Sequence, residues 1–168
     1  MSYEKVKKFL EDNDILDHLS VHNEIGDTVE HAALILGCVP GMIAKTMTFN
    51  LTDQIIAIVM AGDAKIDNAK YKAYFHQKAH MVPYDQVEAL VGYIPGGVCP
   101  FALNDGVKVY LDVSLKSYKY LHTSGGSLNT TIALTIEELE KYSQPVAWID
   151  IAKSWQKTED ERNGSNSI

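Results

Sequence analysis

The sequence predicts a single α/β domain built on a mixed, largely antiparallel sheet that is flanked by helices. Short apolar runs rich in β-branched residues are joined by turns containing glycine, proline or asparagine. Segments with apolar residues at helical spacing lie between these runs, which is typical of a mixed α/β arrangement. With 168 residues, of which 46% are hydrophobic and 22% charged, the chain is long enough to bury a core of its own.

Local signals in the first half of the chain predict alternating helices and strands. In chain order these are a helix at 2–12, a helical turn at 15–19, an edge strand at 20–24, a helix ending at Gly37, strands at 42–50 and 54–61, and a helix at 69–76. The two adjacent strands are expected to form an antiparallel hairpin because only a short turn joins them. Asp27, with Glu30 completing a capping box, or Thr28 is expected to cap the helix that ends at Gly37.

The second half is expected to complete the sheet and to end in a polar tail. The predicted elements are a helix at 83–90, a hairpin turn at 103–106, strands at 107–112 and 118–123 around a helical connection at 113–117, a strand at 132–134, a helix at 135–142, a strand at 146–149 and a helix at 152–157. Asp112 is interpreted as a helix cap rather than as a catalytic carboxylate. Residues 1–157 form the expected domain, and residues 158–168 are polar enough to be disordered.

The stretch from Gly92 to Ala102 is the first candidate for a functional site. Three glycines and two prolines in eleven residues exclude a regular helix or a central strand. Apolar side chains alternate with these residues, so we expect the loop to be packed and rigid. Its glycine amides could bind a carboxylate, a phosphate or a developing oxyanion. A tight connection between a helix and a strand explains the same composition and is kept as the alternative.

Lys45 is the second candidate, because it lies within a predicted strand. It has the same parity as Ile43 and Met47, so its side chain is expected on the face that these apolar residues take. Burial of an unpaired ammonium costs several kcal/mol, which makes a lysine uncommon at such a position. The pattern alone leaves two interpretations open, a functional ammonium and a lysine whose stem is packed while its charge reaches water.

These motifs, in their order and spacing, resemble the YbaK/EbsC family, which is related to the editing domain of bacterial prolyl-tRNA synthetase. The resemblance covers roughly residues 20–142. It is carried by the segments Thr28–Gly37, Ile43–Phe49, Gly96–Phe101, Thr123–Ser127 and Ala133–Leu139. The family implies hydrolysis of the ester that links a wrong amino acid to tRNA, and a curled, barrel-like sheet. It also implies a pocket where the Lys45 strand, the 92–100 loop and the Gly125-Gly126 turn converge.

The resemblance implies roles for twelve residues. The expected catalytic residues are Lys45, Gly97 and Val98, with the two amides orienting or stabilising the ester carbonyl. The expected substrate-binding residues are His22, Thr46, Gly96, Cys99, Pro100, Phe101, Ser124, Gly125 and Gly126. A structural role for His22 is kept as the alternative. Cys99 stands where many relatives have serine, which leaves the amino acid open among small ones such as Cys, Ala or Ser.

Composition excludes several other classes of protein and limits the partners. We find no Ser-His-Asp or Cys-His set, so water or a group of the substrate is the expected nucleophile. No metal site or cofactor is expected, since His76 and His80 have no third ligand near them. The start of the chain is polar and no apolar run could span a bilayer, which predicts a cytoplasmic protein that binds no membrane.

A net charge of −7 argues against tight binding to tRNA alone. The expected partner is therefore the aminoacylated 3′ end of tRNA, presented alone or through an aminoacyl-tRNA synthetase. A non-catalytic module that binds an aminoacyl group or a nucleotide beside a synthetase is the alternative function.

Overall fold

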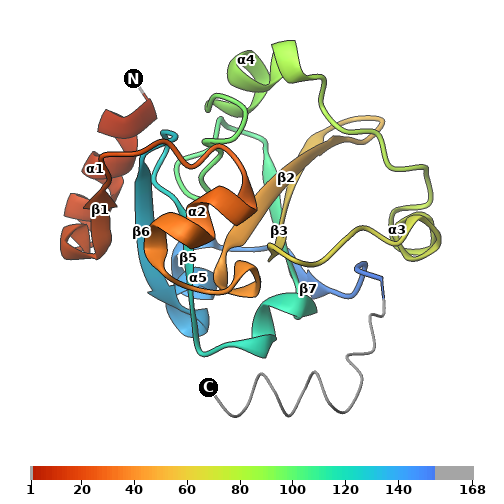
Figure 1. Cartoon of the computed structure of the whole chain (residues 1–168). Helices are drawn as coiled ribbons and strands as arrows, with labels where there is room; N and C mark the ends of the chain where they lie inside the picture. The colour runs from red at the N-terminus through yellow and green to blue at the C-terminus, as the bar shows by residue number, and fades with distance from the viewer. Residues whose placement is uncertain (1, 154–168) are drawn as a thin grey trace, which may run out of the picture.

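Two β-sheets form the centre of the computed structural model, which describes residues 2–153 (Figure 1). The smaller sheet is antiparallel throughout, and its strands lie in the order β1 (Leu19–Val21), β6 (Thr130–Thr135) and β5 (Tyr120–Ser124). The larger sheet is mixed, with the order β2 (Ala44–Asn50), β3 (Ile55–Ala61), β4 (Lys108–Asp112) and β7 (Ala147–Ile149). Its β2–β3 pair is the expected antiparallel hairpin, whereas β4 runs parallel to both of its neighbours. The mixed α/β fold class is therefore confirmed.

The barrel-like curl expected for a single sheet is not supported. Within the described residues the two sheets are joined by one isolated parallel bridge, between Ile43 and His122. β2 is fully paired with β3 along its other edge. Beyond the bridge, β2 and β5 separate, so the sheets stay distinct instead of closing on one another. This separation creates the space for the pocket described below.

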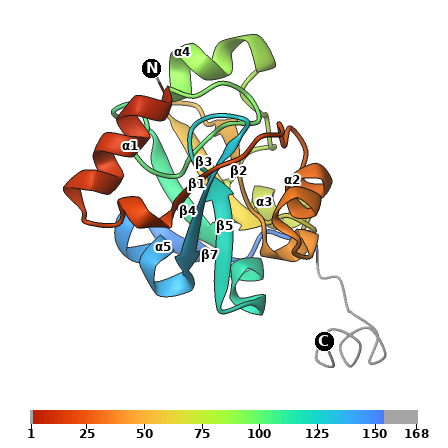
Figure 2. The ribbon, with the colours of Figure 1, turned by 60° about the vertical axis from the view of Figure 1, so that its left-hand side comes forward.

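The helices surround the two sheets and begin and end at residues that the sequence marks. They are α1 (Ser2–Asp12), α2 (Val29–Leu36), α3 (Asn68–Phe75), α4 (Val87–Val91) and α5 (Ile136–Ser143). Thr28 caps α2, since its hydroxyl accepts a hydrogen bond from the His31 amide, so the alternative cap at Asp27 is wrong. α1 and α2 lie on opposite sides of the smaller sheet (Figure 2).

Short 3₁₀ helices complete the architecture as η1 (Leu16–His18), η2 (Pro40–Met42), η3 (Tyr84–Gln86) and η4 (Val113–Ser117). Asp112 caps η4 by accepting a hydrogen bond from the Ser114 amide, as the sequence predicts. Its other carboxylate oxygen accepts from the Ile151 amide at 2.8 Å. The carboxylate is thus fully used in holding β4 and the segment after β7 together.

The core has two layers because β3 is buried on both faces. Between the sheets, Val59 packs with Leu111, Leu121, Ile132 and α1 residues. On the other face of the larger sheet, Ile58 packs with Phe49 and with Tyr71 of α3. Side chains of successive strand residues point to opposite faces, so this continuous apolar strand serves both layers.

Several expected elements differ from what the structure contains. The strand expected at 20–24 ends at Val21, and η3 followed by α4 replaces the single helix expected at 83–90. The turn at 103–106 forms, with the Val107 amide bonded to the Asn104 carbonyl at 3.2 Å, but it leads from the Gly/Pro loop into β4 and makes no hairpin. The helix expected at 152–157 falls largely outside the described residues, and Ala152 itself forms a bridge with Ile66. The tail expected at 158–168 also lies outside them.

Candidate functional site

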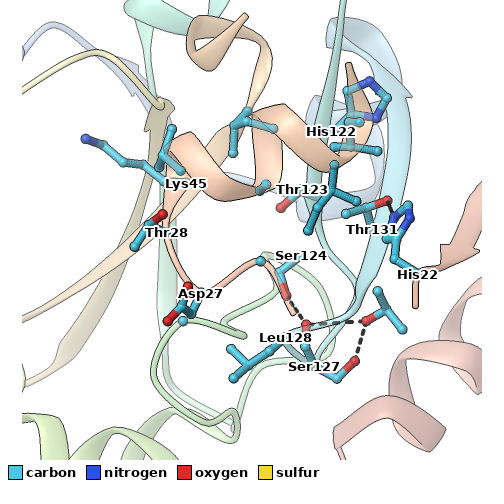
Figure 3. A pocket seen from close by; sticks show the side chains of 18 of the residues that line it. His22, Asp27, Thr28, Lys45, His122, Thr123, Ser124, Ser127, Leu128 and Thr131 are labelled. Atoms are coloured by element: carbon cyan, nitrogen blue, oxygen red, sulfur yellow. Dashed lines mark hydrogen bonds between the residues drawn. The ribbon is translucent and has the colours of Figure 1, made fainter. Parts of the chain in front are cut away.

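A pocket of about 160 Å³ opens where β2 and β5 separate (Figure 3). Residues that follow the Ile43–His122 bridge on the two strands line it from both sides, among them Thr46 and Thr123. α2 closes a third side with an apolar wall, consisting of Val29, Ala32, Ile35 and Leu36. The pocket is therefore a narrow space with apolar walls and a limited number of polar groups, as small-molecule sites usually are.

The Gly/Pro loop reaches the pocket with Gly96 and Val98. The Gly97 amide donates to the Ile94 carbonyl at 2.9 Å, and Gly96 has a φ of 82°. Proline followed by such a glycine is the signature of a type II turn. The Gly97 amide is thus used within the turn. The Val98 amide, in contrast, donates to no acceptor among residues 2–153.

The Ser124–Ser127 turn forms a further part of the rim, although its two glycines do not line the pocket. The Gly125 amide donates to the Thr130 carbonyl at 3.0 Å, and the Gly126 amide donates to the Ser124 hydroxyl at 3.2 Å. A Cβ at Gly125 would lie 2.7 Å from the Thr130 hydroxyl. We conclude that Gly125 and Gly126 allow close packing of the turn, while Ser124 itself lines the pocket.

Lys45 lies at the edge of the pocket with its ammonium directed away from the β5 residues (Figure 3). The ammonium donates to the Gly62 carbonyl at 3.3 Å and to the Ala64 carbonyl. Burial lowers the pKa of Lys45, and the nearby carboxylates of Asp63 and Glu30 act in the opposite direction. The side chain is half-buried and hydrogen-bonded, so its stem is packed and its charge is held in place by backbone oxygens.

Two histidines line the end of the pocket formed by the smaller sheet. The Nε2 atom of His22 lies 2.8 Å from the Thr131 hydroxyl oxygen. Burial lowers the pKa of His122, and the neighbouring His22 contributes in the same direction. Burial therefore favours the neutral form of His122, and among residues 2–153 neither ring is hydrogen-bonded to a serine or cysteine that it could activate as a nucleophile.

Besides Gly125 and Gly126, three further residues expected to bind the substrate lie outside this pocket. Cys99 has an exposed fraction of 0%, and burial raises the pKa of its thiol to about 12. Phe101 is 1% exposed and stacks on Phe9 with ring centroids 5.2 Å apart. Pro100 is buried as well, and with Phe101 it lines a groove on another face. The apolar residues of the loop are drawn into the core, which explains why the structure does not bring these three to the site.

Sequence reasoning also missed several residues that line the pocket. These are His122, Thr123, Ser127, Leu128 and Thr131, with the apolar face of α2. Thr123 pairs with Ile132 and shares the inner face of the smaller sheet with Leu121 and Leu134. Alternation along the strand could have placed Thr123 on that face, since it lies two residues after Leu121. Nothing in the sequence indicates that the inner face opens into a pocket.

The described residues 2–153 form neither a cluster of metal ligands nor a helix that could span a membrane. Among residues 2–153, no three histidine, cysteine or acidic side chains converge as metal ligands would. No helix of that region combines the length and apolar character needed to cross a membrane. The hydroxyl of Ser124 bonds the Ser127 carbonyl at 3.4 Å and does not contact a histidine. A nucleophile for an acyl transfer would thus have to come from water or from the ligand.

Comparison with known proteins identifies the family. A family model described as the aminoacyl-tRNA editing domain matches residues 23–142, which is most of the chain. This chain belongs to the aminoacyl-tRNA editing domain family. The resemblance to YbaK/EbsC proteins is thereby confirmed.

The matches with individual relatives cover most of this chain and most of each relative. YwhH of Bacillus subtilis is 45% identical over 130 residues, which are 77% of this chain and 83% of YwhH. EbsC of Enterococcus faecalis, provisionally named a Cys-tRNA(Pro)/Cys-tRNA(Cys) deacylase, is 30% identical over 126 residues, 73% of this chain and 71% of EbsC. A crystal structure described provisionally as a trans-editing enzyme for prolyl-tRNA synthetase has a TM-score of 0.82 at 22% identity, and the match covers 91% of this chain and 98% of that one. At that identity the structural likeness shows the fold alone.

Proposed function

We propose that this protein is an aminoacyl-tRNA deacylase that hydrolyses the ester between a wrong amino acid and the 3′ end of tRNA. The observation that carries the proposal is the pocket between β2 and β5 within an editing domain. Lys45 lies at its edge, and the unpaired Val98 amide comes from the loop beside it. A cation and a backbone donor at a small pocket are suited to holding an acyl ester near a phosphate.

The size of the pocket supports a small aminoacyl side chain such as that of cysteine, alanine or serine. Its volume of about 160 Å³ is below the roughly 300–1,000 Å³ of typical small-molecule sites. The name of the relative EbsC refers to Cys-tRNA, which is consistent with a substrate of this size. Large aromatic side chains would clash with the wall formed by α2.

The proposed reaction uses water as the nucleophile. The Val98 amide would donate to the ester carbonyl as negative charge develops on its oxygen, while Gly96 and Gly97 hold the turn that presents this amide. Lys45 would bind the terminal nucleotide or its phosphate at the edge of the pocket. His22, Thr46 and Ser124 would contact the substrate from the two strands. Cys99 has no role in this scheme, because its thiol is fully buried.

The proposed partner is the aminoacylated 3′ end of tRNA, delivered in solution or by an aminoacyl-tRNA synthetase, in the cytoplasm. The net charge of −7 offers little counterion release, so contacts to the tRNA body contribute little affinity. We expect binding to uncharged tRNA to be weak at physiological salt. Recognition would then depend on the ester and the terminal nucleotide.

A deacylation assay with a panel of misacylated tRNAs tests the proposal, using Lys45→Ala as the central variant. We expect Lys45→Ala to lower kcat/KM by about 10²–10³, the loss typical of one well-placed charged contact, while thermal unfolding changes little. Lys65→Ala is the matched control, since Lys65 is an exposed lysine near Asp63 and Lys45 but outside the pocket.

The outcomes of this assay are distinct. A folded Lys45→Ala variant with the activity of the unmodified protein would assign Lys45 a structural role. No deacylation of any substrate by the unmodified protein would overturn the proposal. Binding of an aminoacyl-adenosine without turnover would instead indicate the non-catalytic module.

A further inference from the structure

The pocket contains a buried hydroxyl that no protein group uses. Thr123 is 2% exposed and lines the pocket, yet its hydroxyl oxygen has no hydrogen-bond partner among residues 2–153. The hydroxyl of Thr46, on the facing strand β2, is also buried and without a partner in that region. Both residues belong to the inner faces of their sheets, where Thr123 pairs with Ile132 and Thr46 with Val59.

The other hydroxyls of the pocket are paired. Thr28 caps α2, and the Thr131 hydroxyl contacts His22 at 2.8 Å. Ser127 contacts the Thr130 hydroxyl oxygen at 2.7 Å, and Ser124 bonds both Gly126 and Ser127 (Figure 3). Two unpaired hydroxyls on facing strands are therefore exceptions within one small site.

A buried polar group without a partner is unfavourable in the free protein, and a ligand that supplies a hydrogen bond removes this penalty. Around these hydroxyls the pocket is apolar, with the α2 wall on one side and Ile43, Ala44 and Leu128 on the others. The other hydroxyls of the pocket are already bonded within the protein, so those of Thr123 and Thr46 are the ones free to bond a ligand group. A site built to hydrogen-bond a hydroxyl also discriminates strongly against analogues that lack one.

We propose that the Thr123 hydroxyl, together with that of Thr46, determines specificity by hydrogen-bonding a hydroxyl group on the aminoacyl side chain. This inference rests on the proposed deacylase function and narrows its substrate class. Seryl and threonyl esters are favoured over alanyl and valyl esters, which have similar volumes but no hydrogen-bonding group. A cysteinyl ester ranks between them, because a thiol is a weak hydrogen-bond partner.

The test uses Thr123→Val, which keeps the shape of the side chain and removes only its hydroxyl. We measure kcat/KM on Ser-tRNA and Ala-tRNA, and on Thr-tRNA and Val-tRNA as a pair of nearly equal volume. The unmodified protein is expected to favour the hydroxyl-bearing member of each pair by about 10-fold or more. Thr123→Val is expected to reduce both ratios to within about 3-fold without lowering thermal stability, because it removes an unpaired buried group. Thr46→Val is expected to act in the same direction.

Ser143→Ala is the matched control. The Ser143 hydroxyl is buried and without a partner among residues 2–153, but it lies outside this pocket. Its removal should leave thermal stability unchanged or raised, as Thr123→Val does, and should leave both substrate ratios unchanged. A change in specificity in Ser143→Ala would show that the effect of Thr123→Val is indirect, which overturns the proposal.

Binding of non-hydrolysable seryl and alanyl amides of 3′-amino-3′-deoxyadenosine, measured by calorimetry, separates this inference from the deacylase function. Hydrolysis without preference between the members of each pair overturns the inference and leaves the deacylase function standing. Tighter binding of the seryl amide that is lost in Thr123→Val, with no hydrolysis of any ester, supports the inference and overturns the deacylase function. If the protein shows neither hydrolysis nor selective binding, both the inference and the deacylase function are overturned.

Discussion

The two halves of the loop between Gly92 and Ala102 each contain a proline but serve different parts of the molecule. In the first half, the turn at 94–97 places Gly96 and Val98 at the pocket. In the second half, Cys99 is 0% and Phe101 1% exposed, and both pack in the core between the sheets. The backbone at Gly96 and Val98 therefore faces the pocket, whereas the second half is buried through its side chains, as is Tyr93 at the start of the loop.

Contacts made by the buried half explain how the loop is held rigid. Phe101 stacks on Phe9 of α1, and the Tyr93 hydroxyl donates to the Phe101 carbonyl. The half that is anchored in the core thus fixes the half that is directed toward the pocket. The anchor should affect stability, and the pocket half should affect activity.

Phe101→Ala should have the largest effect, and that effect should be on stability. Loss of a fully buried phenylalanine costs about 3–5 kcal/mol of unfolding free energy, because a cavity remains. Chemical denaturation measures this loss, and kcat/KM per folded molecule should stay within a few fold of the unmodified protein. Tyr84→Ala is the control, since Tyr84 is 80% exposed and should change neither quantity. A stability loss below 1 kcal/mol would contradict the role of Phe101 as an anchor.

Gly97→Ala should produce the opposite result, with lower activity and little change in stability. A Cβ at Gly97 would lie 3.1 Å from Cγ1 of Ile94 and 3.4 Å from Cα of Ser127, so the Ile94 side chain within the turn must move by a few tenths of an ångström. A displacement near 1 Å can reduce a catalysed rate by about 10². We expect this smaller displacement to lower kcat/KM for deacylation by up to about 10-fold. Gly106→Ala, where a Cβ would have no atom within 4 Å but φ is +89°, should lower stability through backbone strain and leave activity per folded molecule unchanged.

Cys99→Ala tests whether Cys99, at the boundary between the two halves of the loop, belongs to the buried half. The thiol is fully buried and its pKa is raised to about 12, so it is neither a nucleophile nor a substrate contact. We expect deacylation within about 3-fold of the unmodified protein and a stability loss of about 1 kcal/mol from the small cavity. In the native protein, iodoacetamide should label the partly exposed Cys38 before Cys99, as mass spectrometry would show. Complete loss of activity in a folded Cys99→Ala variant would show that Cys99 takes part in the functional site.

The smallest effect is expected in the pH dependence of stability. This effect comes from His122 in the pocket and not from the buried half of the loop. The pKa of His122 is lowered from 6.5 in the folded protein, mainly by burial. As the pH falls below about 6.5, the unfolded chain takes up this proton first, so stability present above that pH is progressively lost. Thermal unfolding between pH 7.5 and 5.5 should therefore show a smaller decrease for His122→Gln than for the unmodified protein. The other histidines, such as His18 beside Glu138, are present in both proteins. Equal decreases would show that burial of His122 is unimportant.

The sequence was sufficient to predict the order of helices and strands, the β2–β3 hairpin and the cap at Asp112, and it limited the cap of α2 to Asp27 or Thr28. These features depend on interactions between residues close in the chain, which periodicity and capping chemistry report. The family resemblance also named six residues that the structure brings to one pocket, which are His22, Lys45, Thr46, Gly96, Val98 and Ser124.

The direction of each candidate side chain and the place where the two sheets separate depend on contacts between distant parts of the chain. Cys99 and Phe101 are buried because α1 and the inner faces of both sheets cover them, which no local pattern reports. Thr123 became a pocket residue because β5 leaves β2 after the single Ile43–His122 bridge. A strand pattern gives the alternation of faces, but the neighbours of each face come from distant parts of the chain. The local elements could therefore be predicted from residues, whereas the shape of the pocket could not.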